Sequence, residues 1–172
     1  MEKTTFTVRK TEENDWSDIR EIWLDFENSE YVFYDTYKET EPESVKERIK
    51  KWDAANRSGK NDHLFFSVCL SGEVIGFVSA NRCLKGYDIG YGFKKKYQGM
   101  GYGKKGISEV ISILKTYGAE SIYAGTAIKN APSFNLLLSL GFSLRATELL
   151  SFHKDKYGND IVFQGGIFEL EL

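Results

Sequence analysis

Residues 87–103 read YDIGYGFKKKYQGMGYG and hold the most informative pattern in this chain. A β-like run, IGYGF, leads through a lysine-rich corner into a cluster of glycines. Apolar residues then recur at the spacing that places them on one face of a helix: Ile107, Val110, Ile111 and Leu114. A helix N-terminus offers unpaired N–H groups and the positive end of its dipole, and glycines let a large anion approach the backbone. The pattern therefore predicts a phosphate-binding turn between a strand and a helix.

Two familiar phosphate-binding motifs do not fit this turn. Gly101, Gly103 and Gly106 have the spacing G-x-G-x-x-G, but a dinucleotide site also needs an acidic residue ending a second strand about 20 residues further on. The acidic candidate here, Glu120, precedes its strand instead of ending it. A P-loop needs Gly-Lys-Ser/Thr, which the chain lacks. The alternative to an anion site is a purely structural turn before a helix.

The residues around the glycines resemble the GNAT superfamily of N-acetyltransferases. Residues 98–103 match its Gln/Arg-x-x-Gly-x-Gly/Ala signature, between a strand and a helix in the order that this family uses. About 30 residues further on, residues 130–133 (N-x-x-S) and 140–142 (LGF) resemble its second signature. The likeness extends over nearly the whole chain and is sharpest over about residues 74–142. Within the superfamily the sequence is most similar to the branch of ribosomal-protein N-terminal acetyltransferases.

Periodicity and turn signals predict strands and helices in the order β-α-α-β-β-β-α-β-α-β-β. The strands are expected over residues 5–9, 64–70, 74–82, 87–93, 122–126, 143–152 and 161–170. The helices are expected from Asn14 or Asp15 to about residue 26, and over about residues 42–56, 101–117 and 132–140. Ser71-Gly72 is a hairpin signal, and Thr40-x-x-Glu43 has the form of a capping box.

This order indicates an α/β fold with a mixed sheet of about seven strands and helices on both faces. The resemblance implies a mostly antiparallel sheet that is splayed between the fourth and fifth strands, where acetyl-CoA enters. Gly90 and Gly92 are compatible with this, because glycine inside a strand often marks a bulge or a close approach. We expect one acetyltransferase domain over residues 1–172.

Bulk composition narrows the class of protein. The chain has 172 residues, 15% of them aromatic and 28% charged, which fits a globular enzyme and not a disordered chain. The net charge of −2 argues against nucleic acid as a partner. We see no apolar run for a signal or a membrane span, and expect a cytoplasmic protein without a membrane partner. Cys69 and Cys83 lie in apolar runs and are expected as buried thiols, and two distant histidines indicate no metal site.

The resemblance implies acetyl-CoA as co-substrate and assigns its site. Backbone N–H groups of residues 98–103, with Lys104, would hold the pyrophosphate, and the strand backbone near Tyr91 and Phe93 would pair with the pantetheine amides. The full set is Tyr91, Phe93, Gln98, Gly99, Met100, Gly101, Tyr102, Gly103, Lys104 and Asn130. Lysines 94–96 would either meet the nucleotide phosphates or form a solvated corner of the surface.

Catalytic residues are less clear from the sequence. Many family members carry a tyrosine general acid where this chain has Leu137, and in the ribosomal branch the serine here numbered 133 is proposed instead. Ser133 is equally read as a helix cap. The base that relatives carry corresponds to Arg145, so we expect Asp88 or Glu148 in that role, with exposed strand carboxylates as the alternative. A backbone N–H of the fourth strand would stabilise the oxyanion.

An aromatic segment over residues 26–37 is expected to face the acceptor. Tyr31 and Tyr34 would form its wall, and the acidic neighbours Glu27, Glu30 and Asp35 suit a cationic amine. The alternative is a connecting loop packed on the core. The predicted function is direct acetyl transfer from acetyl-CoA to a primary amine, either a protein N-terminus or a small molecule. The alternative is a catalytically weak acyl-CoA-binding or regulatory module, and a homodimer is possible.

Overall fold

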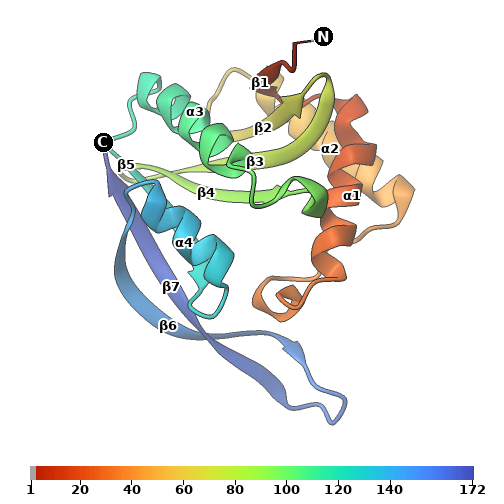
Figure 1. Ribbon diagram of the computed structural model, residues 1–172, viewed down its shortest axis with the longest axis vertical. Coiled ribbons are helices and arrows are strands. Elements are labelled where there is room, and N and C mark those ends of the chain that lie inside the picture. Colours follow the sequence, from red (N-terminus) through yellow and green to blue (C-terminus); the bar gives the residue numbers. More distant parts are fainter. Residues whose placement is uncertain (1–2) are drawn as a thin grey trace.

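A seven-stranded sheet with helices on both faces forms the body of the protein in a computed structural model that describes residues 3–172 (Figure 1). The strands are β1 (Phe6–Lys10), β2 (His63–Leu70), β3 (Glu73–Cys83), β4 (Gly86–Phe93), β5 (Ser121–Ala127), β6 (Ser143–Lys154) and β7 (Asp160–Glu171). Their order across the sheet is β1-β2-β3-β4-β5-β7-β6, and every pair is antiparallel except β4 with β5. The predicted mixed, mostly antiparallel α/β fold is therefore confirmed.

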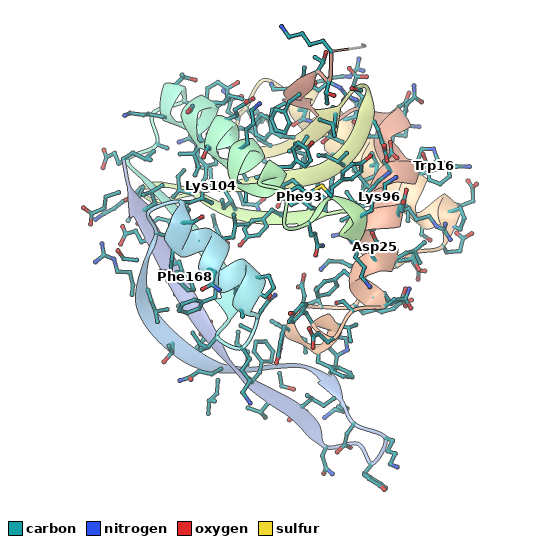
Figure 2. The ribbon with its side chains drawn as sticks, in the orientation of Figure 1. Trp16, Asp25, Phe93, Lys96, Lys104 and Phe168 are labelled. Atoms are coloured by element: carbon teal, nitrogen blue, oxygen red, sulfur yellow. The ribbon has the colours of Figure 1, made fainter. Side chains whose placement is uncertain are left out.

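Four helices cover the two faces of this sheet. The helices α1 (Trp16–Glu27) and α2 (Pro42–Arg57) pack on one face, and α3 (Tyr102–Thr116) and α4 (Ala131–Ser139) on the other (Figure 1). Three short 3-10 turns lie at Glu13–Asp15, Val32–Tyr34 and Lys95–Tyr97. Side chains alternate between the faces along each strand, so β2 sends Phe66 and Val68 towards α3 and Phe65 towards α2. Phe168 of β7 lies under α4, where its ring meets Phe134 edge-on (Figure 2).

The strands β4 and β5 part midway along β4. Their parallel pairing runs from Gly86 opposite Ser121 to Ile89 opposite Ala124 and then ends, whereas β3 stays paired with β4 as far as Phe93. The splay expected between the fourth and fifth strands is thus present. At Gly92 an added Cβ would lie 3.0 Å from Ile22 and 2.9 Å from the ring of Phe77, so glycine here allows α1 to approach the strand closely.

Local signals for turns were read correctly at the β2–β3 hairpin and wrongly at the start of α2. Ser71 and Gly72 both have positive φ, of 48° and 87°, as a type I′ turn requires. The cap of α2 is Glu41, whose carboxylate accepts hydrogen bonds from two N–H groups of the first turn, so the capping box assigned to Thr40 is not formed. The carboxylate of Glu41, one residue closer to the helix than Thr40, accepts from the N–H groups of Glu43 and Ser44.

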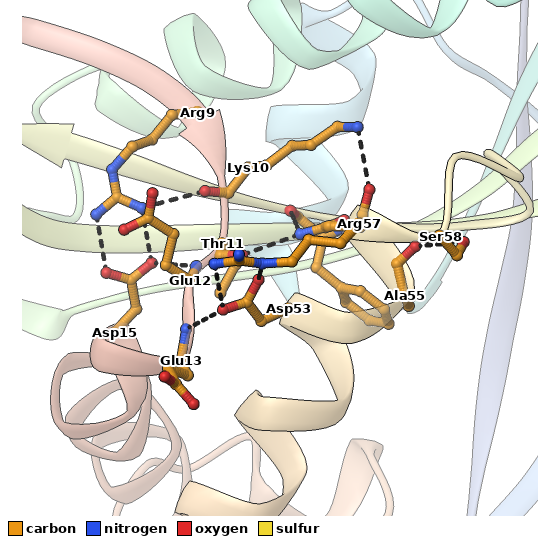
Figure 3. A network of polar contacts seen from close by, with 12 residues as sticks. Arg9, Lys10, Thr11, Glu12, Glu13, Asp15, Asp53, Ala55, Arg57 and Ser58 are labelled. Atoms are coloured by element: carbon orange, nitrogen blue, oxygen red, sulfur yellow. Dashed lines mark hydrogen bonds and ion pairs between the residues drawn. The ribbon is translucent and has the colours of Figure 1, made fainter.

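A buried polar network fastens the two helices on the first face to the sheet (Figure 3). Arg9 of β1 donates two hydrogen bonds of 2.8 Å to Asp15, which also accepts from Ser67 of β2. Burial raises the pKa of Asp15, but the hydrogen bonds from Arg9 and its other donors outweigh burial and lower it. Asp53 of α2 accepts from the N–H of Glu13 and pairs with Arg57. The segment leading into α1 is therefore fixed both to the sheet and to the end of α2.

The two cysteines differ in their surroundings. Cys69 on β2 is buried, as expected, but Cys83 at the end of β3 is only half-buried, so the prediction of two buried thiols is wrong for Cys83. The two thiols are not joined by a disulfide. Within residues 3–172, no helix is long and apolar enough to cross a membrane.

Packing of α3 on the sheet depends on Gly106. A Cβ there would lie 2.8 Å and 3.1 Å from the two methyl groups of Val68, which is fully buried and stiff, whereas a Cβ at Gly103 meets only ordinary contacts at 3.5 Å. We expect Gly106→Ala to lower the free energy of unfolding by about 1–2 kcal/mol through overpacking. Gly103→Ala should leave it unchanged or raise it by up to about 1 kcal/mol. Urea denaturation of both variants checks this, and equal stabilities would contradict the packing role of Gly106.

Candidate active site

A cleft of about 810 Å³ opens where β4 parts from β5. Its walls come from the end of α1 and the loop after it, from the end of β4, from the turn before α3 and from the first turns of α4. Phe93, Lys104 and Asp25 lie around the opening from three of these segments (Figure 2). One continuous space thus connects the glycine turn with the aromatic loop.

The glycine turn presents unpaired donors to this cleft. Gly99 and Gly101 have positive φ, of 75° and 86°, and Gly101 caps α3 without any side-chain hydrogen bond. None of the N–H groups of residues 101–104 donates to an acceptor elsewhere in residues 3–172. Gly99, Gly101, Gly103 and Lys104 all line the cleft. Free N–H groups at the positive end of a fifteen-residue helix favour a bound anion.

Other members of the predicted cofactor set lie differently around this turn. The side-chain amide of Gln98 donates to the carbonyl of Phe93 at 2.9 Å, which ties the turn to the end of β4. Met100 is 64% exposed and does not line the cleft. The ring of Tyr102 stacks on Phe6 on the far side of α3, so only its backbone N–H is directed to the turn. Gly106, the third glycine of the apparent dinucleotide motif, serves helix packing.

The free edge of β4 supplies a second row of polar groups. The N–H of Lys94 donates to Ile75 of β3 at 2.8 Å, and antiparallel pairing alternates along the strand. The N–H and C=O groups of Tyr91 and Phe93 therefore point away from β3, into the gap left by β5. Gln98 occupies the carbonyl of Phe93, which leaves the N–H of Phe93 and both groups of Tyr91 without a strand partner.

Two hydroxyl groups meet across this gap. The phenol of Tyr91 and the hydroxyl of Ser133 are 2.7 Å apart, and both residues line the cleft. Burial raises the pKa of Tyr91 to about 12, although the hydrogen bond to Ser133 opposes it. Asn130, not Ser133, caps α4, since its side-chain oxygen accepts the N–H of Ser133. Leu137, at the position where many relatives have tyrosine, is fully buried in the core.

The three consecutive lysines have three different environments, and Lys94 is not available for phosphates because it is buried. Lys94 is 1% exposed and pairs with Asp18, Glu21 and Glu73 at 2.7–3.0 Å. Burial lowers the pKa of Lys94, but the three carboxylates outweigh burial and raise it. Lys96 pairs with Glu73 at 2.9 Å. Treating the three lysines as one group is wrong for the buried Lys94, whereas Lys95 and Lys96 are exposed and Lys95 lines the cleft.

The predicted bases Asp88 and Glu148 lie together outside the main cleft. They line a second hollow of about 540 Å³ on the other face of the sheet, with Tyr123 and Gly125 of β5. Asp88 faces away from α3 because its neighbours on β4 point into the core on the α3 side. Partial burial raises the pKa of the Asp88 carboxyl. Arg145 is engaged with Glu169 and Glu171 of β7.

The aromatic loop after α1 contributes Tyr31, Glu30 and Asp35 to the cleft, but not Glu27 or Tyr34. Tyr34 packs against Phe163 of β7, with ring centres 5.2 Å apart. A ring nitrogen of His153 on β6 hydrogen-bonds the carbonyl of Asp35 at 2.6 Å. The sequence analysis missed His153 and Phe163, because no local pattern shows that the last hairpin reaches this loop. It also missed that Trp23 of α1 lines the cleft.

Comparison with known proteins identifies the family. An acetyltransferase (GNAT) domain model matches residues 5–143, so the chain belongs to the GNAT acetyltransferase family. Acetyl transfer is therefore its general class of activity. No curated protein shows significant sequence similarity to this chain.

Solved structures share the fold at low identity. A ribosomal-protein-S5-alanine acetyltransferase from Vibrio fischeri has a TM-score of 0.78 at 19% identity, over 96% of this chain and 92% of that one. A putative acetyltransferase from Salmonella typhimurium, solved with acetyl-CoA, has a TM-score of 0.73 at 22% identity, over 97% and 94%. The ribosomal-protein-S18-alanine N-acetyltransferase from Escherichia coli has a TM-score of 0.68 at 17% identity, over 97% and 94%.

Glu73 of β3 holds the 3-10 turn that follows β4 through contacts with Lys94, Lys96 and Tyr97, and these contacts should weaken at low pH. Hydrogen bonds from Tyr97, Lys96 and Lys94 lower the pKa of Glu73 to about 2, below its ordinary value of 4.5. Its contribution to stability is therefore complete above about pH 4.5 and is lost as the pH falls towards 2. We expect Glu73→Gln to flatten the fall of unfolding free energy over this range, measured by urea denaturation. The control Glu43→Gln removes an exposed ion pair with Lys46 and should show the same loss of unfolding free energy at low pH as wild type. The same pH dependence in both variants would contradict the stabilising role of Glu73.

Proposed function

We propose that this protein transfers an acetyl group directly from acetyl-CoA to a primary amine, either a protein N-terminus or a small-molecule amine. One observation carries the proposal. The unpaired N–H groups of residues 101–104 and the free edge of β4 beyond Ile89 open into the same cleft. An anion and a chain of amides can therefore be held side by side in one continuous space.

The cofactor would span these two rows of donors. The pyrophosphate would bind at the turn, where residues 101–104 supply unpaired N–H groups and Lys104 and Lys95 supply positive charge. The N–H of Gln98, expected to contribute, donates instead to the carbonyl of Lys95. The amides of the pantetheine arm would pair with the C=O of Tyr91 and the N–H of Phe93, as an added strand pairs with a sheet edge. The side-chain NH₂ of Asn130 is free of other bonds within residues 3–172 and lines the same wall.

The reaction itself needs an oxyanion donor and an acceptor for the amine's proton. The N–H of Tyr91 is the first on β4 without a strand partner, so we assign it to the oxyanion, a contact typically worth about 2.7–4 kcal/mol. Asp88 or Glu148 would take the proton from the amine, from the hollow on the opposite face of the sheet. Ser133 lies beside the gap, where the sulfur would leave.

The acceptor would enter past the aromatic loop. Tyr31, Glu30 and Asp35 line this end of the cleft, and Tyr34 supports the wall from behind through its contact with Phe163. Two acidic side chains favour a cationic amine, and Lys38 balances one of them through its pair with Asp35 at 3.2 Å. The solved N-terminal acetyltransferases of ribosomal proteins make a protein N-terminus the first acceptor to test.

A second candidate function is a catalytically weak acyl-CoA-binding module. It is favoured by the buried Leu137 at the usual acid position and by the engagement of Arg145 with Glu169 and Glu171. Release of free thiol from acetyl-CoA, stimulated by members of an amine panel, would distinguish transfer from binding. Tight binding without any amine-dependent release would favour the module.

Cofactor binding is tested by filling the wall beside the glycine turn. A Cβ at Gly103 points towards Phe93 and Leu136, both in the cleft wall, so Gly103→Val should place methyl groups where the cofactor lies. We expect the affinity for acetyl-CoA in calorimetry to fall at least about tenfold, a loss of about 1.4 kcal/mol. Ser108→Val puts the same side chain on an exposed position of α3 and should bind as wild type does. Equal affinities in both variants would place the cofactor elsewhere.

The base is tested through the pH dependence of the rate. Because burial raises the pKa of Asp88, the acidic limb of the profile should lie above the ordinary aspartate value of about 3.9. We expect Asp88→Asn or Glu148→Gln to remove that limb and to lower the plateau rate by about 10²–10⁴-fold. Profiles measured at saturating substrates that stay unchanged in both variants would exclude both residues as the base.

A further inference from the structure

We propose that Tyr91 and Ser133 form a hydroxyl pair that receives the sulfur of coenzyme A as a thiolate, with Ser133 touching the sulfur and Tyr91 positioning Ser133. This inference rests on the proposed acetyl transfer and adds the fate of its leaving group. It assigns a role to the phenol of Tyr91, whose backbone alone entered the cofactor site above.

The placement of the pair follows from the strand. The N–H of Tyr91 points into the gap between β4 and β5, while its side chain lies on the α3 and α4 face of the sheet. A thioester whose carbonyl oxygen meets that N–H has its sulfur one bond from the carbonyl carbon. The phenol of Tyr91 and the hydroxyl of Ser133, 2.7 Å apart, both line the cleft into which that N–H points, so they form a polar pair on its wall.

The order of the hydrogen bonds follows from acidity. A phenol is a stronger acid than an aliphatic alcohol, so the O–H of Tyr91 donates to Ser133, and the O–H of Ser133 is left to donate to the sulfur. Asn130 fixes the backbone of Ser133 by accepting its N–H. Ser133 lies in the first turn of the nine-residue helix α4, whose positive end favours a negative sulfur.

The sulfur leaves without taking a proton from this pair. A thiol has a pKa of about 8.5, and the buried phenol of Tyr91 has a pKa of about 12, so the proton stays on the tyrosine. As the C–N bond forms and the C–S bond breaks, the electron pair of the C–S bond goes to sulfur. The amine nitrogen gives its proton to the base, and the thiolate is protonated later by water. The pair thus supplies hydrogen bonds, not a proton.

The test titrates the thiol of bound coenzyme A, a product, so that no acceptor has to be known. Ultraviolet absorbance of the thiolate is followed against pH in wild type, Tyr91→Phe, Ser133→Ala and the double variant. We expect the bound thiol to titrate about one pH unit lower in wild type than in Tyr91→Phe, because hydrogen bonds to a charged group have roughly this effect. In the Ser133→Ala background, Tyr91→Phe should add nothing.

A matched control separates positioning from packing. Tyr87→Phe removes another phenol from the same strand, one that donates to Asn61 at 2.9 Å, and should leave the thiol titration as in wild type. Once an accepted amine is known, Tyr91→Phe should lower kcat about tenfold with little change in KM for acetyl-CoA.

The outcomes distinguish this inference from the proposed function. A folded wild type that binds no coenzyme A would overturn both. Binding with the same thiol pKa in wild type and Tyr91→Phe would overturn the hydroxyl pair and leave acetyl transfer intact. An effect of Tyr91→Phe that persists undiminished without Ser133 would refute the order Tyr91 to Ser133 to sulfur.

Discussion

The early end of the pairing between β4 and β5 is the constraint on which the rest of this structure depends. Strand edges inside a sheet normally satisfy their polar groups with a neighbour, and here β4 loses its neighbour after Ile89 while β3 still holds it to Phe93. The groups left over at Tyr91 and Phe93 require a partner from outside the chain. Because the glycine turn follows only a few residues later, the same parting brings the free N–H groups at the start of α3 to the same cleft.

The buried Lys94 holds this arrangement in place. A lone ammonium group in the interior is costly, so the lysine is stable only because Asp18, Glu21 and Glu73 surround it. These carboxylates come from α1 and β3, and the N–H of Lys95 donates to Asp25 of α1 as well. The end of β4 is thereby fixed to the helix that leads into the aromatic loop. The glycine turn before α3 and the aromatic loop after α1 are therefore held by the same set of contacts around Lys94.

The sequence was informative wherever a feature depends on neighbours along the chain. Periodicity placed the strands and helices to within a few residues, and the glycines marked the turn before α3. The sequence did not show that Lys94 is buried while Lys95 and Lys96 are exposed. This difference arises because α1, some 70 residues earlier in the chain, packs against Lys94. Likewise no local pattern shows that Tyr34 meets Phe163, or that Asp88 and Glu148 share a hollow, since each pair is joined only by the order of strands in the sheet.

The two faces of the sheet divide the proposed chemistry between them. The turn, Ser133 and the side chain of Tyr91 lie on the face of α3 and α4, whereas Asp88 and Glu148 lie on the opposite face. In the proposed reaction the amine and acetyl-CoA share the cleft where β4 and β5 part, and the carboxylates proposed to take the amine's proton line a separate hollow. Cysteine chemistry fits less well, because burial raises the pKa of Cys69, and neither Cys69 nor Cys83 lines the cleft beside the glycine turn. The direct transfer proposed above needs neither thiol, since the amine itself attacks the thioester in the cleft.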